Sequence, residues 1–134
     1  MNHKQFKVTV TRQLPEPVET RMKELFDVNL SNSPHPLTRE QLIEIVKDCD
    51  VLVPTIGDKI DENFIKETGK RLKLIANYGV GFDHIDVLNA TKRGITVTNT
   101  PNVLTEDTAD MAMALIISVP RRIKDGVKRL ADDA

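Results

Sequence analysis

Two glycines separated by one residue, Gly79 and Gly81, give the strongest chemical signal in this sequence. They follow the run Leu72–Ala76, whose composition is typical of a buried strand. In such a turn the backbone N–H groups can point into one concavity, which suits a carboxylate or a phosphate. A plain strand-to-helix turn that needs glycine for its φ angles has the same spacing, so the spacing alone leaves both interpretations open.

Two further segments follow short strands in the same manner. Pro54–Gly57 comes after Val51–Val53, and Asn99–Pro101 comes after Ile95–Thr98. In an open parallel sheet, ligands bind beyond the carboxyl ends of the strands. We therefore expect these segments and the glycine pair to share one edge of a sheet.

The glycine pair is not part of a dinucleotide-binding fingerprint. That motif requires a third glycine three residues after the second, and the sequence has His84 at that position. A phosphate-binding Gly-Lys-Ser/Thr loop is also absent from the sequence. A response-regulator receiver domain is excluded on its chemistry, because Val51–Val53 is followed by Pro54 where such a domain carries an aspartate.

No metal site is expected from the side chains that could bind one. The sequence has three histidines without metal-ligand spacing: His3, His35 and His84. A surface or loop role is favoured for each of them. Asp83 and Asp86 bracket His84, which permits an acid–base pair, but helix capping and surface solvation account for the carboxylates more simply. The single cysteine, Cys49, cannot form an intramolecular disulfide and fits a small core residue.

Charge and composition exclude several classes of function. The 134 residues include 20 acidic and 19 basic ones, for a net charge of −1, with one Tyr, four Phe and no Trp. A nucleic-acid partner is not expected, because backbone binding needs a basic excess and base stacking needs aromatic side chains. The most apolar run, Ala109–Val119, is far shorter than the ~20 residues that span a membrane. The sequence opens without the apolar stretch of a signal peptide, so we expect a cytoplasmic protein without membrane contact.

Alternating strands and helices predict the fold class. Five short runs have strand composition: Lys7–Thr11, Val28–Leu30, Val51–Val53, Leu72–Ala76 and Ile95–Thr98. The intervening segments show helical spacing or capping residues, namely Val18–Phe26, a capping box from Thr38 to Gln41, and N-caps at Asp61 and Asp86. Gly69 and Gly94 stand where the last two of these helices should end. The pattern predicts an α/β flavodoxin-like fold, a five-stranded parallel sheet with helices on both faces.

The last part of the chain, residues 101–134, differs from this pattern. A long C-terminal helix is predicted from Thr105, apolar on nearly every side up to Val119. Pro120 should kink this helix by removing a backbone donor, and an apolar stripe continues to Leu130. A helix this apolar is expected to have a partner.

Two strings of the sequence resemble a signature of the D-isomer-specific 2-hydroxyacid dehydrogenases. They are Leu74–Asp86, which contains the glycine pair, and Arg93–Asp110; the likeness continues through Pro120–Arg122. Together they cover roughly the last half of the chain in unbroken register, which is more specific than a lone glycine motif. The segment Val53–Thr55 and the residues around Asn77 resemble the glyoxylate reductase and glycerate dehydrogenase branch of that family.

This resemblance implies roles for particular residues. In the family, the substrate carboxylate is bound by backbone N–H groups of the glycine loop, which places substrate binding at Val80 and Gly81, flanked by Gly79 and Tyr78. The resemblance also places Val80 and Thr108 near the nicotinamide of NAD or NADP. It implies no metal and no catalytic side chain in this sequence.

The resemblance further implies the division of the chain. Residues 1–100 correspond to the flavodoxin-like substrate-binding domain, and residues 101–134 to the crossover and first helix of a Rossmann domain. In the family this helix lies near the dimer interface, so a homodimer through residues 105–130 is expected.

The implied activity is NAD(P)-dependent hydride transfer to a small 2-keto acid. Family members are more than twice this length, and their glycine fingerprint and their Arg, Glu and His have no counterpart here. We therefore expect a truncated chain that is inactive alone and binds no cofactor tightly. Two alternatives remain open: an interaction module built on residues 105–130, and a weak binder of small carboxylates that uses Tyr78–Gly81.

Overall fold

The computed structural model describes residues 6–132, so that His3 lies outside the described part. The chain divides into two compact units, one that ends at Pro101 and one that begins at Asn102. This division falls one residue after the boundary expected from the sequence. The assignment of the second unit to a Rossmann domain remains a prediction.

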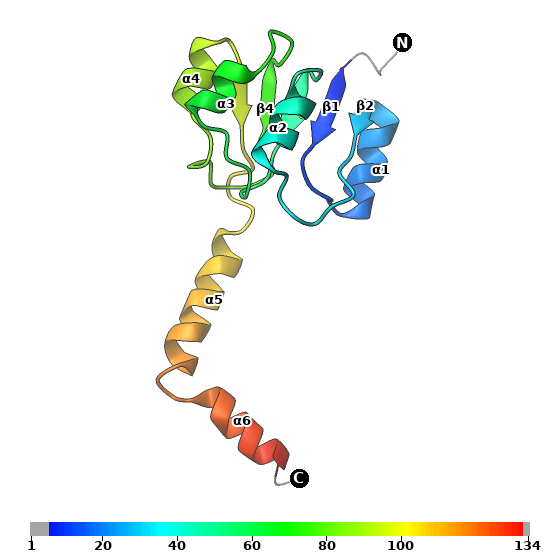
Figure 1. The fold of residues 1–134 in the computed structure, drawn as a ribbon. Coiled ribbons are helices and arrows are strands. Elements are labelled where there is room, and N and C mark those ends of the chain that lie inside the picture. Colours follow the sequence, from blue (N-terminus) through cyan, green and yellow to red (C-terminus); the bar gives the residue numbers. More distant parts are fainter. Residues whose placement is uncertain (1–5, 133–134) are drawn as a thin grey trace. The chain divides into compact units, whose positions relative to one another are not determined.

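The first unit contains a five-stranded parallel sheet with the strand order β2-β1-β3-β4-β5 (Figure 1). Its strands are β1 (Lys7–Val10), β2 (Asp27–Asn29), β3 (Val51–Val53), β4 (Leu74–Ala76) and β5 (Thr96–Thr98). In the centre of the sheet, Leu52 of β3 is paired with Ile75 of β4, and Ile75 with Val97 of β5. The predicted α/β parallel sheet is therefore confirmed.

Four helices cover the two faces of the sheet: α1 (Glu16–Leu25), α2 (Arg39–Val46), α3 (Glu62–Glu67) and α4 (Val87–Lys92). The crossover from β1 to β2 runs in one direction along the sheet, and the later crossovers run in the other. Right-handed connections therefore place α1 on one face and α2, α3 and α4 on the other. Two hydrophobic clusters follow from this arrangement, one around Leu52, Phe64 and Ile75 and one around Val8 and Val10.

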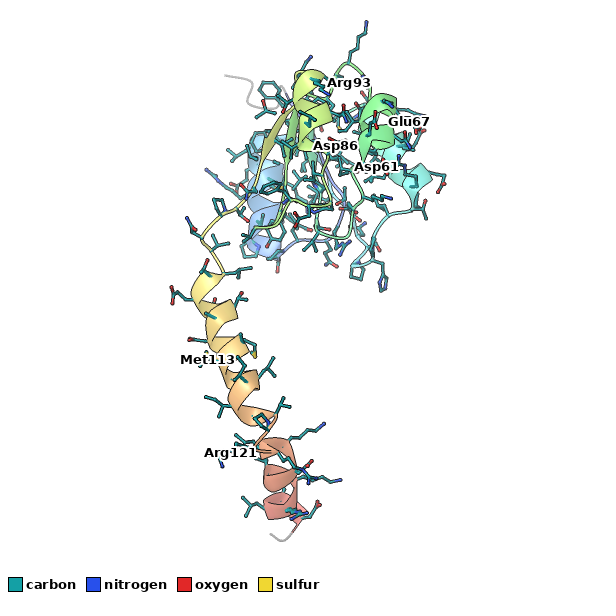
Figure 2. The ribbon with its side chains drawn as sticks, turned by 90° about the vertical axis from the view of Figure 1, so that its left-hand side faces the viewer. Asp61, Glu67, Asp86, Arg93, Met113 and Arg121 are labelled. Atoms are coloured by element: carbon teal, nitrogen blue, oxygen red, sulfur yellow. The ribbon has the colours of Figure 1, made fainter. Side chains whose placement is uncertain are left out.

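Local capping interactions begin the helices where the sequence indicated. The side chain of Thr38 accepts a hydrogen bond from the backbone N–H of Gln41, whose own side chain accepts one from Thr38. The carboxylates of Asp61 and Asp86, both labelled in Figure 2, accept from backbone N–H groups at 2.9 and 3.0 Å. Gly94 ends α4 with a φ of 73°, as expected for a glycine after a helix.

The end of α3 differs from the prediction of a glycine cap. The chain leaves the helix through Thr68, which has an extended conformation, and Gly69 has no positive φ. The guanidinium of Arg93 (Figure 2) donates to the backbone carbonyls of Ile65 and Thr68. A side chain from α4's end thus takes over the task of a glycine cap, because it binds carbonyl groups that the helix leaves free.

The second unit consists of α5 (Thr105–Ser118) and α6 (Ile123–Asp132). Pro120 does more than kink a single helix: residues 119–122 form a turn, and Arg122 has a φ of 51°. Proline removes one backbone donor and clashes with the preceding turn, which ends α5. The side chains of both helices, Met113 among them, project outward in Figure 2, and neither helix buries a residue. Within residues 6–132, no helix combines the length and the hydropathy needed to cross a membrane.

An apolar hollow of about 460 Å³ lies on the α1 face of the sheet. Aliphatic side chains of β1, β3 and β4 form its floor, and Met22 and Phe26 stand beside it. The hollow follows from the topology, since α1 covers the β1–β2 side of this face.

Because β4 lies in the interior of the sheet, a substitution in it tests the packing of the core directly. Ile75 is 0% exposed, whereas Ile56 is 72% exposed. Ile75→Val should lower the free energy of unfolding by about 0.5–1.5 kcal/mol, because it removes a buried methylene. The same change at Ile56 should have almost no effect. Urea unfolding followed by circular dichroism measures both, and equal losses would contradict this packing.

Candidate functional site

The three segments expected at one edge of the sheet do lie together. The backbone N–H of Tyr78 donates to the carbonyl of Pro54 at 2.9 Å, and Thr55 forms a parallel bridge with Tyr78. The N–H of Thr100 donates to the carbonyl of Gly79 at 3.1 Å. The segments after β3, β4 and β5 therefore form a continuous surface at the carboxyl ends of these strands.

The glycine loop, defined as Tyr78–Gly81, lies at the centre of this edge. Tyr78 and Val80 have exposed side chains, 45% and 38% respectively, while Gly79 is half-buried and Gly81 exposed. Among the described residues, no acceptor receives a hydrogen bond from the N–H of Val80 or Gly81. The loop thus offers two backbone donors to a ligand.

Neither loop glycine is required by its φ angle. Gly79 and Gly81 are both outside the positive-φ region, so the interpretation as a turn that needs glycine for its backbone angles is wrong. A Cβ added at Gly81 would meet no atom within 4 Å. Because Gly81 has no side chain, there is open space beside its backbone N–H, which has no partner among the described residues.

Two asparagine side chains hold the carbonyl groups of the loop. The amide Nδ2 of Asn77 donates to the carbonyls of Gly79 and Gly81 at 3.2 and 2.8 Å. The amide Nδ2 of Asn99 donates to the carbonyl of Val80 at 2.8 Å. Sequence reasoning did not single out the role of either asparagine. A signal was present, since a polar amide stands directly after each of two apolar strands.

His84 belongs to the same network. Its Nε2 lies 3.2 Å from Oδ1 of Asn77, and the residue is half-buried in a turn, in agreement with the expected loop role. Burial lowers the pKa of His84, and the negative charges of Asp58 and Asp83 oppose this effect. The neighbouring Asp86 caps α4, which confirms the capping interpretation for that carboxylate.

A buried carboxylate braces the adjoining loop. Asp58 is 2% exposed, and its Oδ2 accepts from the N–H and hydroxyl of Thr55 at 2.7 and 3.2 Å and from the hydroxyl of Thr11. Nearby, Nη2 of Arg12 lies 2.6 Å from where a Cβ of Gly57 would stand, so that a larger residue there would displace the guanidinium. Nε and Nη2 of Arg12 and Oδ1 of Asp58 are buried without a hydrogen-bond partner in the described part of the chain.

The remaining predicted site residue is Thr108. It lies on α5 in the second unit and is exposed. Its expected place near a nicotinamide remains a prediction. Across residues 6–132, no group of three His, Cys, Asp or Glu side chains is arranged to hold a metal ion.

The Asp58 network has a measurable energetic consequence. Asp58→Ala should lower the free energy of unfolding by about 3 kcal/mol, because it leaves the N–H of Thr55 buried without an acceptor. Asp58→Asn keeps an oxygen of the same reach and should cost about 1 kcal/mol. Asp83→Ala, at an exposed position, is the control and should stay within about 0.5 kcal/mol of the unchanged chain. Urea unfolding separates these cases, and an Asp58→Ala loss as small as that of Asp83→Ala would exclude a bracing role.

This chain is similar to several known proteins. The model of a family described as "D-isomer specific 2-hydroxyacid dehydrogenase, catalytic domain" matches residues 8–127. A curated glyoxylate reductase from Korarchaeum cryptofilum (strain OPF8) is 47% identical over 117 residues, which cover 87% of this chain and 35% of that protein. The chain thus spans about 35% of the length of that relative.

Two solved structures share the fold. The TT0316 protein from Thermus thermophilus is 40% identical with a TM-score of 0.83, over 94% of this chain and 40% of that chain. The NAD⁺-bound 3-phosphoglycerate dehydrogenase of Entamoeba histolytica is 28% identical with a TM-score of 0.69, over 84% of this chain and 38% of that chain.

Proposed function

Because the chain belongs to the D-isomer-specific 2-hydroxyacid dehydrogenase family, we propose that its first unit binds the carboxylate of a small 2-keto acid. The reaction that this binding serves is the NAD(P)-dependent reduction of glyoxylate or a similar acid. The proposal rests on the similarity to glyoxylate reductases and on the glycine loop. The glyoxylate reductases carry the remaining two thirds of their length outside the matched region, and the rest of the activity is assigned to that region.

One observation carries the proposal. The N–H groups of Val80 and Gly81 are unpaired within the described residues, and the carbonyls of Gly79, Val80 and Gly81 are already engaged. A carboxylate accepts hydrogen bonds from backbone N–H groups, and such charge-assisted bonds are stronger than neutral ones. The loop therefore presents two free donors whose neighbouring carbonyls already have partners, as an anion requires.

This edge of the sheet offers part of a site for a nicotinamide cofactor. The exposed side chains of Tyr78, Val80 and Phe82 offer an apolar rim on which a flat ring can lie. We place Val80 and Thr108 beside the nicotinamide, which supplies the hydride when it is bound. The sequence lacks the glycine fingerprint for the pyrophosphate, so this chain contributes the rim and not the main binding site.

The residues of this chain bind and orient the substrate but do not exchange its proton. We assign the proton exchange to the part of the relatives' length that lies outside the match. We expect no NADH oxidation with glyoxylate from this chain alone. Binding of the acid should be weak, because water reaches the open side of the site.

The proposal is tested by a titration of glyoxylate into the ¹⁵N-labelled chain. The amide resonances of Val80 and Gly81 should shift with saturation. Gly81→Ala should abolish these shifts, because a methyl group would occupy the space beside the N–H. The fold should persist, since the added Cβ meets no atom and φ is not positive.

Gly126→Ala is the matched control for this substitution. A Cβ there also meets no atom within 4 Å, and Gly126 lies in α6, away from the loop in sequence. It should leave the titration unchanged. Glycolaldehyde, which lacks the carboxylate, should cause no shifts. Glyoxylate shifts that survive Gly81→Ala, or that are matched by glycolaldehyde, would count against carboxylate binding at this loop.

A second candidate function is association through residues 105–130. Helix α5 exposes most of its large apolar side chains, including Met111, Leu115 and Ile116. Exposed apolar area of this kind is typical of an interaction surface. A homodimer through α5 and α6 would bury it.

A change on α5 tests this association. Multi-angle light scattering should give about twice the mass of one chain at high concentration. Leu115→Lys should reduce it to the monomer mass, because a charge would be placed on the buried surface. Leu88→Lys, at a comparably exposed leucine of α4, should leave the dimer intact. A monomer mass for the unchanged chain across all concentrations would rule out the dimer.

A further inference from the structure

The side chain of Asn77 fixes the shape of the glycine loop. Asn77 is 2% exposed and stands directly after β4, where its backbone N–H donates to the carbonyl of Thr98 at 2.9 Å. Its backbone is therefore part of the sheet ladder. From this rigid base, its amide reaches the carbonyls of Gly79 and Gly81. The loop is thus attached to the sheet by a side chain as well as by the backbone.

The engaged carbonyls determine where the free N–H groups point. In a planar trans peptide, the carbonyl of one residue and the N–H of the next point in opposite directions. The carbonyl of Gly79 is held by Asn77, so the N–H of Val80 points away from that amide. The carbonyl of Val80 is held by Asn99, so the N–H of Gly81 points away from Asn99. The two donors of the proposed carboxylate site are oriented before any ligand binds.

The loop carbonyls and His84 together determine how the Asn77 amide is turned. The loop carbonyls can only accept, so Asn77 must direct its NH₂ group toward them and its Oδ1 toward His84. Nε2 of His84, 3.2 Å from that oxygen, must then carry a proton. Burial favours the neutral imidazole, in which a proton on Nε2 leaves Nδ1 without one. With His84 in this tautomer, a flipped Asn77 amide would lose its bonds to the loop and to His84 together.

We propose that His84 and Asn77 are positioning residues of the carboxylate site: His84 fixes the Asn77 amide, and the amide holds the N–H groups of Val80 and Gly81 toward the ligand. This inference rests on the proposed function of the glycine loop. His84 acts through Asn77 and exchanges no proton with the substrate.

Substitutions of His84 in the ¹⁵N-labelled 134-residue chain test the inference. His84→Phe keeps a ring of similar size but has no N–H to donate. It should weaken glyoxylate binding about fivefold, the effect of one lost hydrogen bond. His84→Gln, whose amide can donate, should restore most of the affinity. His35→Phe, at an exposed loop histidine, is the matched control and should leave the dissociation constant unchanged.

Two spectroscopic readouts separate positioning from general stability. Imidazole ¹⁵N shifts of the unchanged chain should show the Nε2–H tautomer of His84. The side-chain NH₂ protons of Asn77 should exchange slowly with solvent, and faster in His84→Phe. Asn99→Ala, which frees the carbonyl of Val80 without touching His84, should also weaken binding. The His84 tautomer of the unchanged chain tests the inference if His84→Phe does not fold.

Each outcome decides between the two claims. Equal glyoxylate affinity of His84→Phe and the unchanged chain, or an Nδ1–H tautomer, overturns the positioning role alone. Loss of affinity in His84→Phe that His84→Gln does not restore also overturns it, since the donor would then not be what matters. An unchanged chain that binds no glyoxylate overturns the proposed function itself, and the positioning role with it.

Discussion

The arrangement of helices in this fold depends on one constraint, the right-handedness of the connections between parallel strands. Because the chain passes from β1 to β2 in one direction and then reverses toward β3, β4 and β5, the helices are divided between the two faces. The face with α2, α3 and α4 closes over Phe64 and Ile65, both 0% exposed. On the opposite face α1 covers the β1–β2 side, and the hollow of about 460 Å³ lies beside it.

The parallel direction of the strands determines where polar groups collect. Every strand is parallel, so the segments after β1, β3, β4 and β5 all leave the sheet at one edge. That edge holds the buried carboxylate of Asp58, the amide of Asn77 and the unpaired guanidinium nitrogens of Arg12. Buried polar groups without partners are rare in folded proteins, and they concentrate at functional sites. The opposite edge of the sheet has exposed ion pairs instead, in which Arg71 holds the pKa of Asp50 below its usual value.

The sequence predicted those features that depend on neighbouring residues. The strand Val51–Val53 and the N-caps Asp61 and Asp86 were located correctly, because β-branched runs and capping boxes act within a few residues. The way α3 ends was not predicted correctly, because the guanidinium that binds its carbonyls belongs to Arg93, which lies in the next crossover. The glycine loop was located for the same local reason, but the φ-angle explanation for its glycines was wrong.

The site residues missed by sequence reasoning share one property. Asn77, Asn99 and His84 act through side-chain hydrogen bonds whose partners depend on how the segments after β4 and β5 fold. A pattern along the chain shows that an amide follows a strand, but not which carbonyl it will meet. The burial of a side chain likewise depends on segments that meet only in the folded chain. Asp58 has the sequence context of a surface turn residue, but the segments of Thr11 and Thr55 close around it and leave it 2% exposed.

A carboxylate site built from backbone N–H groups has a particular selectivity. The donors carry no net charge, and the negative charges of Asp58 and Asp83 are close enough to act on His84 beside the loop. The loop itself therefore contributes no charge to binding, and its recognition of a carboxylate rests on the directions of two N–H groups. Two oriented N–H groups add little binding free energy unless the loop is already rigid. Each residue that has to be ordered on binding costs about 1–2 kcal/mol of conformational entropy. The side-chain amides that follow β4 and β5 order the loop when the protein folds, so this entropy is not lost on binding. The sheet edge then sets the orientation of the carboxylate, and a cation elsewhere can add affinity.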